Sequence, residues 1–236
     1  METLDVIQSR EQFLQTEYLQ GRITTDHFLK QINSLIERRR KIKRKTKRKM
    51  NNEEKLRKLY NRVTGCDRCE LHKERTNVVF GSGNAYADVM FIAEAPGKKE
   101  DETGLPFQGK AGVNFDNGLK QAGLLRDDVF VCNLLKCRPS QNRNPKPEEI
   151  AECGFYLYKQ IDIIKPRIVV TLGSFASKYL LKMNESMKTM QDKFYHIYIN
   201  DNPIHVLPTY HPASIIYDNT RREQYFENFK FLKTIL

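Results

Sequence analysis

Residues 88–97 read Asp-Val-Met-Phe-Ile-Ala-Glu-Ala-Pro-Gly, a short apolar run that gives way at once to an acid and a Pro-Gly turn. Three further runs have the same β-rich character, at residues 129–134, 167–172 and 204–209. Helical stretches follow them at about residues 111–123, 147–164, 174–182 and 220–234. Short apolar strands that alternate with helices form a mainly parallel sheet covered on both faces. We therefore expect an α/β fold of three layers, α/β/α, around a central, mainly parallel four-stranded sheet.

Each predicted strand ends in polar or conformationally special residues. These ends are residues 94–97, Asn133, residues 173–174 and residues 210–212. In open sheets of this kind, ligands bind beyond the carboxyl ends of the strands. We expect several of these ends to line one pocket.

The positive charge of the chain is concentrated near its start. The 236 residues have a formal net charge of +11, and residues 1–60 hold 16 Lys and Arg against 8 Asp and Glu, and so +8. Ten of the twelve positions 38–49 are basic. Such a run is a solvated helix, an arm that neutralises DNA phosphates or a nuclear-import signal. We expect a helical, strongly basic extension over residues 1–60 and a separate domain over residues 61–236.

Within the extension, apolar residues recur at helical spacing on both sides of a break. Gly21, followed by Thr24-Thr25-Asp26, is typical of a helix end and a new N-cap. The pattern predicts two helices, at about residues 8–19 and 26–49.

The sequence offers no signal for a membrane. Its apolar runs, such as residues 168–170, are far too short to span a bilayer. Residues 1–5 carry acids where a secretory signal needs Lys or Arg. We expect an intracellular, cytoplasmic protein, with the nucleus left open. The positive excess favours nucleic acid over a small acidic molecule as the partner.

Five cysteines in a protein expected inside the cell indicate metal or redox chemistry before disulfides. Cys66 and Cys69 form a Cys-x-x-Cys pair in a loop-like stretch. Cys137 follows the second strand, and Cys153 lies in a predicted helix. By spacing alone, a structural zinc site, an iron–sulfur cluster, a redox dithiol and buried unligated cysteines all stay open. Cys132, inside the strand, is expected to be a small buried hydrophobe.

Three blocks of sequence follow one another in the second part of the chain. Residues 94–112 read Glu-Ala-Pro-Gly-Lys-Lys-Glu-Asp-Glu-Thr-Gly-Leu-Pro-Phe-Gln-Gly-Lys-Ala-Gly. Residues 133–139 read Asn-Leu-Leu-Lys-Cys-Arg-Pro, with Asn-Arg-Asn-Pro and Pro-Glu-Glu soon after, and residues 208–214 read Pro-Thr-Tyr-His-Pro-Ala-Ser. In this order, the blocks closely resemble the motifs of the family 4 uracil-DNA glycosylases.

The resemblance implies a DNA repair enzyme. Such a glycosylase flips uracil out of single- or double-stranded DNA and hydrolyses its N-glycosidic bond, leaving an abasic site. Cysteines at the positions of Cys66, Cys69, Cys137 and Cys153 hold a [4Fe–4S] cluster in this family. The resemblance therefore favours iron–sulfur over zinc, and we expect the cluster to be structural.

Recognition of a flipped uracil needs an aromatic face and a group that reads the base edge. We expect Phe107, in a Gly- and Pro-rich loop, to supply the face. The carboxamide of Asn133 can accept from uracil N3–H and donate to O4, which suits the reading role. Ala95 is expected beside the base, at the position where the best-known uracil glycosylases carry an Asp.

Bond cleavage builds negative charge on the departing base. As the matching histidine is thought to do in the family, His211 is expected to donate to uracil O2. Because Ala95 cannot activate water, a nearby acid is expected to take over. Glu94 and Glu100 are the candidates, and we favour Glu94, since Glu100 could equally organise the loop.

Basic residues near the motifs are expected to hold DNA phosphates. The predicted phosphate contacts are Lys110, Lys136, Arg138 and Arg143. Ile215 and Ile216 are expected to wedge into the duplex. Tyr217 stands where the family usually has an arginine. No basic insert follows Arg138, which disfavours the covalent chemistry of another branch of the superfamily.

Two other classes of protein remain as alternatives. The chain could be a non-catalytic or a zinc-dependent nucleic-acid-binding protein that kept the glycosylase fold. Whichever class is correct, glycosylase included, we expect a monomer. The basic extension could also bind a replication or repair protein.

Overall fold

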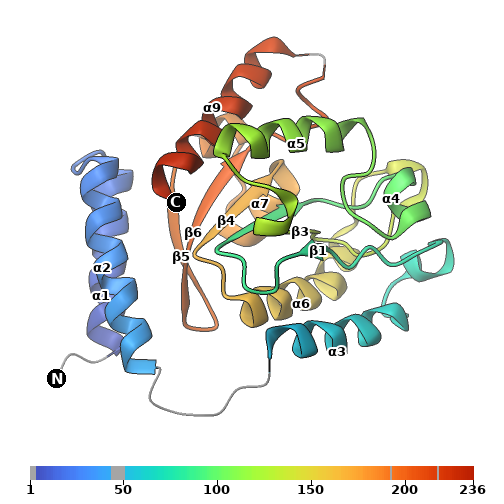
Figure 1. The fold of residues 1–236 in the computed structure, drawn as a ribbon, viewed down its shortest axis with the longest axis horizontal. Helices are drawn as coiled ribbons and strands as arrows, with labels where there is room; N and C mark the ends of the chain where they lie inside the picture. The colour runs from blue at the N-terminus through green and yellow to red at the C-terminus, as the bar shows by residue number, and fades with distance from the viewer. Residues whose placement is uncertain (1–3, 44–50, 192, 217) are drawn as a thin grey trace.

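The computed structural model describes residues 4–43, 51–191, 193–216 and 218–236. At its centre is a sheet in the order β1-β3-β2-β4-β6-β5 (Figure 1). The bounds are β1 Ser82–Gly83, β2 Val89–Ala93, β3 Phe130–Asn133, β4 Ile168–Leu172, β5 Tyr195–Ile199 and β6 Asn202–Thr209. β3, β2, β4 and β6 pair in parallel and are the four predicted strands, whereas the outer strands β1 and β5 pair antiparallel to β3 and β6.

The prediction of four strands was therefore incomplete, and both missing strands lie at the edges of the sheet. β1 has only two residues, too few for an apolar pattern. β5 joins β6 through Asn200-Asp201, and both of these residues have positive φ. This is the conformation of a tight hairpin turn whose twist matches that of the strands.

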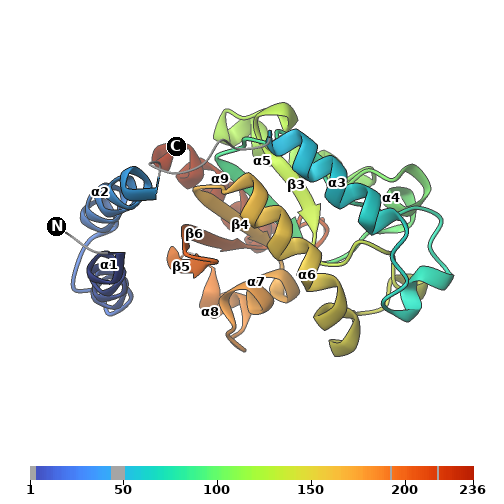
Figure 2. The ribbon, with the colours of Figure 1, turned by 90° about the horizontal axis from the view of Figure 1, so that it is seen from below.

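Helices cover both faces of the sheet, which confirms the predicted three layers (Figures 1 and 2). On one face, α3 (Asn52–Thr64), α6 (Pro147–Ile164) and α7 (Ser174–Leu181) pack over a buried apolar cluster. On the other face, α5 (Lys110–Ala122) and α9 (Asn219–Ile235) pack over a second cluster. The short helices are α4 (Lys98–Thr103), α8 (Met187–Met190), η1 (Glu70–Lys73), η2 (Arg126–Asp128) and η3 (Ser140–Asn142).

The N-terminal helices α1 (Leu4–Leu19) and α2 (Thr25–Lys43) lie beside β5, as Figure 2 shows. Phe28 of α2 is fully buried and meets the ring of His205 of β6 edge-on at 6.1 Å. Gln15 of α1 donates from Nε2 to the carbonyl of Phe194, just before β5, at 3.4 Å. This part of the extension is therefore docked on the sheet and not detached from it.

One feature of the extension differs from the expectation, and part of another lies outside the described residues. The predicted boundary at residue 60 falls inside α3, whose Leu56, Leu59 and Val63 belong to the core under α6. The second predicted helix reaches Lys43 in the structure, and residues 44–50 of the basic run lie outside the described residues. Among the helices that the structure describes, none is long and apolar enough to cross a membrane.

Candidate active site and cysteine pocket

A cleft of about 370 Å³ opens beyond the carboxyl ends of β2, β3 and β6. It is lined by Glu94, Ala95, Pro96, Gly97, Glu100, Phe107, Ala111, Asn133, Pro139, Asn142, Arg143, His211 and Ala213. The ends of three predicted strands thus share one pocket. All six residues expected to bind or cleave the base line it, as does Arg143 among the expected phosphate contacts.

Phe107 is held in place by an unusual backbone conformation. Its φ of 55° lies in the left-handed region, which costs a residue with a side chain roughly 1–2 kcal/mol. Its ring stacks on Phe115 of α5, with centroids 4.6 Å apart and planes 14° apart. His211 lies near the same ring at 6.0 Å and 27°. The Phe107 ring therefore joins α5 to the cleft.

Two residues fix the loop behind Phe107. Arg126 of η2 donates to the carbonyl of Phe107 at 2.8 Å and to that of Pro106 at 3.2 Å. Asp116 orients the same guanidinium, accepting from its Nε at 2.6 Å. Gly112 is required here, because a Cβ on it would lie 2.1 Å from the Phe107 carbonyl oxygen. No motif in the sequence pointed to Arg126, which lies in the connection before β3.

Glu100 joins the two ends of the motif loop. Its Oε1 accepts from the backbone N–H of Gln108 at 2.8 Å and of Gly109 at 3.2 Å. Its Oε2 accepts from the N–H of Gly97 at 3.1 Å. Both carboxylate oxygens are therefore used in holding backbone.

Glu94 has a different environment from Glu100. It is half-buried and lines the cleft, and burial raises the pKa of its carboxyl group. Within the described part of the chain, no side chain or backbone N–H donates a hydrogen bond to that carboxyl group. It faces the cleft with both oxygens available.

Asn133 is the last residue of β3 and is 3% exposed. Its backbone carbonyl accepts a hydrogen bond from Nζ of Lys136 at 2.6 Å. Its carboxamide lines the cleft and makes no hydrogen bond to any residue that the structure describes. The backbone is fixed while the carboxamide remains available to a ligand.

The tautomer of His211 follows from one hydrogen bond. Its Nδ1 accepts from the backbone N–H of Ala213 at 3.1 Å. In the neutral ring the proton must then be on Nε2. Burial lowers the pKa of His211 from 6.5 to about 4, and the nearby Glu100 carboxylate opposes the shift only in part. His211 is therefore a neutral Nε2–H donor near neutral pH.

This environment predicts the titration of His211. NMR signals of its ring should not move between about pH 8 and pH 5, because the folded protein protonates this ring only near its pKa of about 4. The unfolded chain binds the same proton near pH 6.5. The stability that neutral His211 contributes is then complete above pH 6.5 and is lost as the pH falls toward 4. A midpoint close to 6.5 in the folded protein would contradict this assignment.

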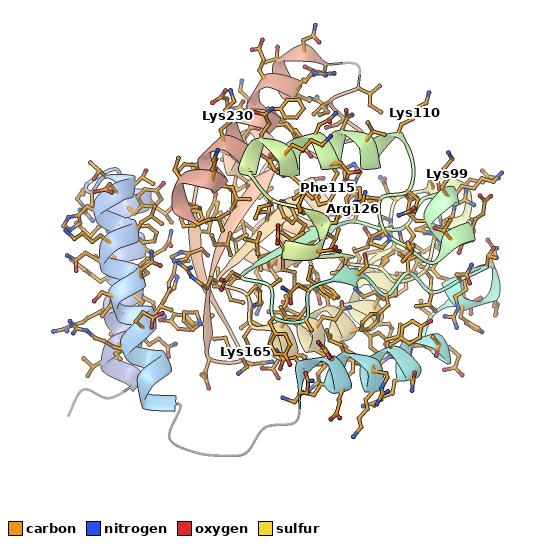
Figure 3. All side chains as sticks on the ribbon, viewed as in Figure 1. Lys99, Lys110, Phe115, Arg126, Lys165 and Lys230 are labelled. Carbon is orange, nitrogen blue, oxygen red and sulfur yellow. The ribbon has the colours of Figure 1, made fainter. Side chains whose placement is uncertain are left out.

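Three of the four expected phosphate contacts are exposed or half-buried. Lys110 is exposed at the start of α5, and Figure 3 shows it and Lys99 pointing outward. Arg143 makes two hydrogen bonds to Glu149, at 2.9 and 2.5 Å. Arg138, half-buried, donates from Nε to Asn142 at 2.7 Å. Arg143 lines the cleft, and Lys110 and Arg138 each adjoin a lining residue in sequence, Ala111 and Pro139.

Two of the expected DNA contacts were wrong. Lys136 is 1% exposed, and its Nζ is bonded inside the protein, so it cannot reach a phosphate. Ile215 is 1% exposed and belongs to the core beneath α9, so it cannot wedge into a duplex. Ile216 beside it is half-buried. Tyr217 lies outside the described residues.

The four cysteines of the predicted ligand set line a second pocket. Its walls are Val63, Cys66, Arg68, Cys69, His72, Arg75, Lys136, Cys137, Glu152, Cys153 and Tyr156. Among the residues described, no three His, Cys, Asp or Glu side chains are grouped so as to hold a single metal ion. Cys132 does not line the pocket and is fully buried in β3.

The chemistry of this pocket suits thiolate ligands. Cys137 Sγ accepts from Nη1 of Arg75 at 3.3 Å, and Cys153 Sγ accepts from the backbone N–H of Lys136 at 3.1 Å. Burial raises the pKa of the Cys153 thiol to about 12. A buried thiol of this kind stays protonated near neutral pH, and a metal that binds the sulfur displaces its proton, which is released to solvent. Four cysteines around one pocket, two of them with hydrogen bonds to sulfur, fit an iron–sulfur cluster.

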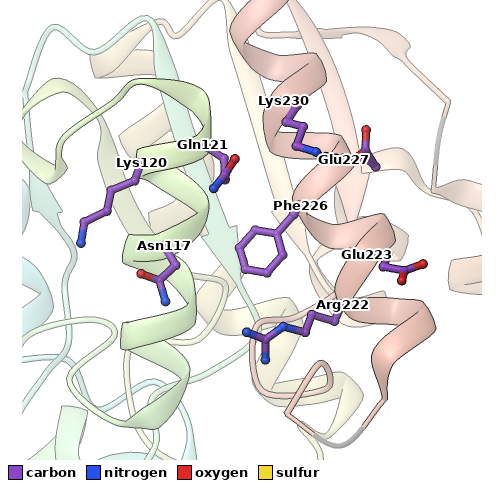
Figure 4. Close-up of a pocket in the computed structure, with 8 residues that line it drawn as sticks. All are labelled: Asn117, Lys120, Gln121, Arg222, Glu223, Phe226, Glu227 and Lys230. Atoms are coloured by element: carbon purple, nitrogen blue, oxygen red, sulfur yellow. Dashed lines mark hydrogen bonds and ion pairs between the residues drawn. The ribbon is translucent and has the colours of Figure 1, made fainter.

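A third hollow lies between α5 and α9 (Figure 4). It is lined by Asn117, Lys120, Gln121, Arg222, Glu223, Phe226, Glu227 and Lys230. Lys230 pairs with Glu227 at 2.7 Å, so cations and carboxylates are mixed along it. It contains none of the residues of the strand-end cleft.

Comparison with known proteins agrees with this geometry. A family model described as the uracil DNA glycosylase superfamily matches residues 80–233. The type-4 uracil-DNA glycosylase of Archaeoglobus fulgidus is 40% identical over 172 residues, which cover 71% of this chain and 86% of that protein. The type-4 enzyme of Saccharolobus solfataricus is 45% identical over 179 residues, which cover 74% and 83%. A type-5 enzyme of Pyrobaculum aerophilum is 30% identical over 149 residues, which cover 56% and 64%. The chain therefore belongs to the uracil DNA glycosylase superfamily.

Proposed function

We propose that this protein is a uracil-DNA glycosylase that flips uracil out of DNA and hydrolyses its N-glycosidic bond, leaving an abasic site. One observation carries the proposal. Within a single cleft, an aromatic ring, a carboxamide without a protein partner and a neutral imidazole with Nε2–H available lie together. These are the three groups that extraction, reading and release of uracil require.

Each group has a role in this proposal. Phe115 stacks on the Phe107 ring from the protein side, which leaves the cleft side for the base. The Asn133 carboxamide accepts from uracil N3–H and donates to O4. The Nε2–H of His211 donates to O2 as negative charge develops there in the transition state. A neutral donor is sufficient, because it is already oriented before the reaction begins.

We assign the water-binding role to Glu94 and not to Glu100. Both oxygens of Glu100 are engaged by backbone N–H groups, whereas the carboxyl group of Glu94 faces the cleft. Ala95 leaves room beside the base. Lys110, Arg138 and Arg143 are the proposed phosphate contacts, together with the basic run at residues 38–49.

We also propose that Cys66, Cys69, Cys137 and Cys153 hold a [4Fe–4S] cluster. When bound, the cluster supplies a covalent cross-link between the loop that carries Cys66 and Cys69, the segment after β3, and α6. No step of base release needs electrons from it. The cluster therefore fixes the segment that follows Asn133.

The function is tested by incubating the full chain, purified without oxygen, with a uracil-containing oligonucleotide. Release of free uracil and an alkali-labile site at that position are expected. An oligonucleotide with thymine at the same place is the control. DNA binding without release would leave the non-catalytic DNA-binding protein as the better reading.

The proposed ligand set predicts that only four of the five cysteines are needed to bind iron. Protein that contains the cluster is expected to be brown. Cys153→Ala should lose this colour and most of the iron, because one iron atom of the cluster then has no cysteine ligand. Cys132→Ala should keep both, since Cys132 lies inside β3, outside the pocket. Iron and zinc analysis of both variants measures this. Stoichiometric zinc in the unaltered protein would instead support a zinc site.

A further inference from the structure

Lys136 is a buried ammonium group without an anionic partner. It is 1% exposed, and its Nζ donates to the backbone carbonyl of Asn133 and to Oε1 of Gln160, both at 2.6 Å. Both acceptors are neutral. No carboxylate of the described residues forms an ion pair with it.

The surroundings of Lys136 leave it little freedom to move. Gln160, itself fully buried, donates from Nε2 to the carbonyl of Phe80 at 2.8 Å. The backbone carbonyl of Lys136 accepts from the N–H of Val79 at 2.8 Å, and its N–H donates to Cys153 Sγ. The side chain is therefore fixed from both ends.

A buried ammonium group is destabilising unless a negative charge lies nearby to offset its loss of hydration. Taking an unpaired ammonium ion out of water costs several kcal/mol even after the protein relaxes, and neutral hydrogen-bond acceptors offset only part of it. The adjacent wall of the cysteine pocket offers such a charge. Lys136 lines that pocket together with all four thiols, and Arg75 donates to one of them. Once deprotonated, four thiolates bring more negative charge than the cluster core balances.

We propose that Lys136 is the buried counter-charge of the thiolates that hold the cluster, and that its hydrogen bond makes it a positioning residue for Asn133. This rests on the proposed function and cofactor. It links two sites that the sequence presents separately: the residue that reads the base and the ligands that hold the iron. The link is a single residue, whose Nζ donates to Asn133 and whose backbone N–H donates to Cys153 Sγ.

Two substitutions separate charge from hydrogen bonding. Lys136→Met removes both, whereas Lys136→Gln removes the charge and keeps an N–H donor. Lys188→Met, at an exposed position of α8, is the matched control. All three are made in the full chain and purified without oxygen.

The first measurement concerns the cluster alone. With an iron chelator, both Lys136 variants should lose their iron about ten- to hundred-fold faster than the unaltered protein. Their reduction potential should be lower, because removal of a nearby positive charge disfavours the added electron. The Lys188→Met control should match the unaltered protein. If both Lys136 variants keep the cluster lifetime and reduction potential of the unaltered protein, Lys136 is not the counter-charge of the thiolates.

The second measurement concerns the base. Lys136→Met should weaken the binding of free uracil about ten-fold, since one strong hydrogen bond that fixes Asn133 is lost. Lys136→Gln should recover most of this affinity while its cluster remains labile. Equal uracil affinity in Lys136→Met and the unaltered protein would overturn the positioning role.

The outcomes distinguish this inference from the proposed function. If the unaltered protein binds iron but releases no uracil from DNA, the proposed glycosylase function is wrong. The cluster measurements then still test whether Lys136 is the counter-charge of the thiolates. If the unaltered protein binds no iron, the counter-charge is overturned. A general loss of packing would lower uracil affinity in both variants. Recovery of uracil affinity in Lys136→Gln therefore indicates the positioning role.

Discussion

Asn133→Ala is expected to lower the rate of uracil release on the order of 1,000-fold. In the proposed complex the base edge faces Asn133 inside the cleft, and without the carboxamide its N3–H and O4 lose their hydrogen-bond partners. The 3% exposure of Asn133 means that no bulk water replaces the lost bonds. Single-turnover excision from a uracil-containing oligonucleotide measures the effect.

Two further variants sharpen this test. Asn184→Ala, an exposed asparagine bonded to Lys178, should excise uracil at the unaltered rate. Asn133→Asp should release cytosine detectably, because a protonated acid can accept from cytosine N4–H and donate to N3. Near-normal uracil release by Asn133→Ala would remove Asn133 from the reading role.

His211→Ala is expected to slow the chemical step about 100- to 1,000-fold while DNA affinity stays close to normal. The loss corresponds to one oriented donor at the position where charge develops in the transition state. The Ala213 N–H would lose its acceptor, but the turn keeps the bonds from Ser214 to the His211 carbonyl. Single-turnover rates at saturating enzyme separate this effect from binding.

The control for His211 is His27→Ala, at an exposed position of α2. It should leave the rate unchanged. A His211→Ala protein that cleaves at the unaltered rate, with DNA bound, would show that the imidazole only fills space beside Phe107.

The strands that carry the site could be predicted from the sequence, and the edges of the sheet could not. Buried parallel strands read as continuous apolar runs, so β2, β3, β4 and β6 were recognisable. β5 has two half-buried positions and so was harder to recognise as a buried strand. The feature that indicates this strand is the turn at Asn200-Asp201, which joins it to β6. The same pattern placed Asn133 and His211 at strand ends, and the resemblance to the family's motifs implied the role of His211.

The direction of side chains beyond the strands could not be predicted. Basic composition made Lys136 resemble a phosphate ligand, but the turn after β3 directs it back into the protein. Ile215 likewise follows the histidine motif and returns to the core. Arg126 supports the Phe107 loop from 19 residues away, and no local pattern marks it.

The docked hairpin of α1 and α2 has a consequence for work with shortened chains. It lies along β5, an outer strand whose far side would otherwise be open to pairing with another chain. Removing residues 1–50 to study the basic run would also uncover His205 and Phe194, which stack on each other at 4.7 Å under Phe28. The shortened protein would tend to associate edge to edge and precipitate. The basic run is better neutralised by exchanging Lys and Arg for Gln, which leaves the hairpin as a cap on the sheet.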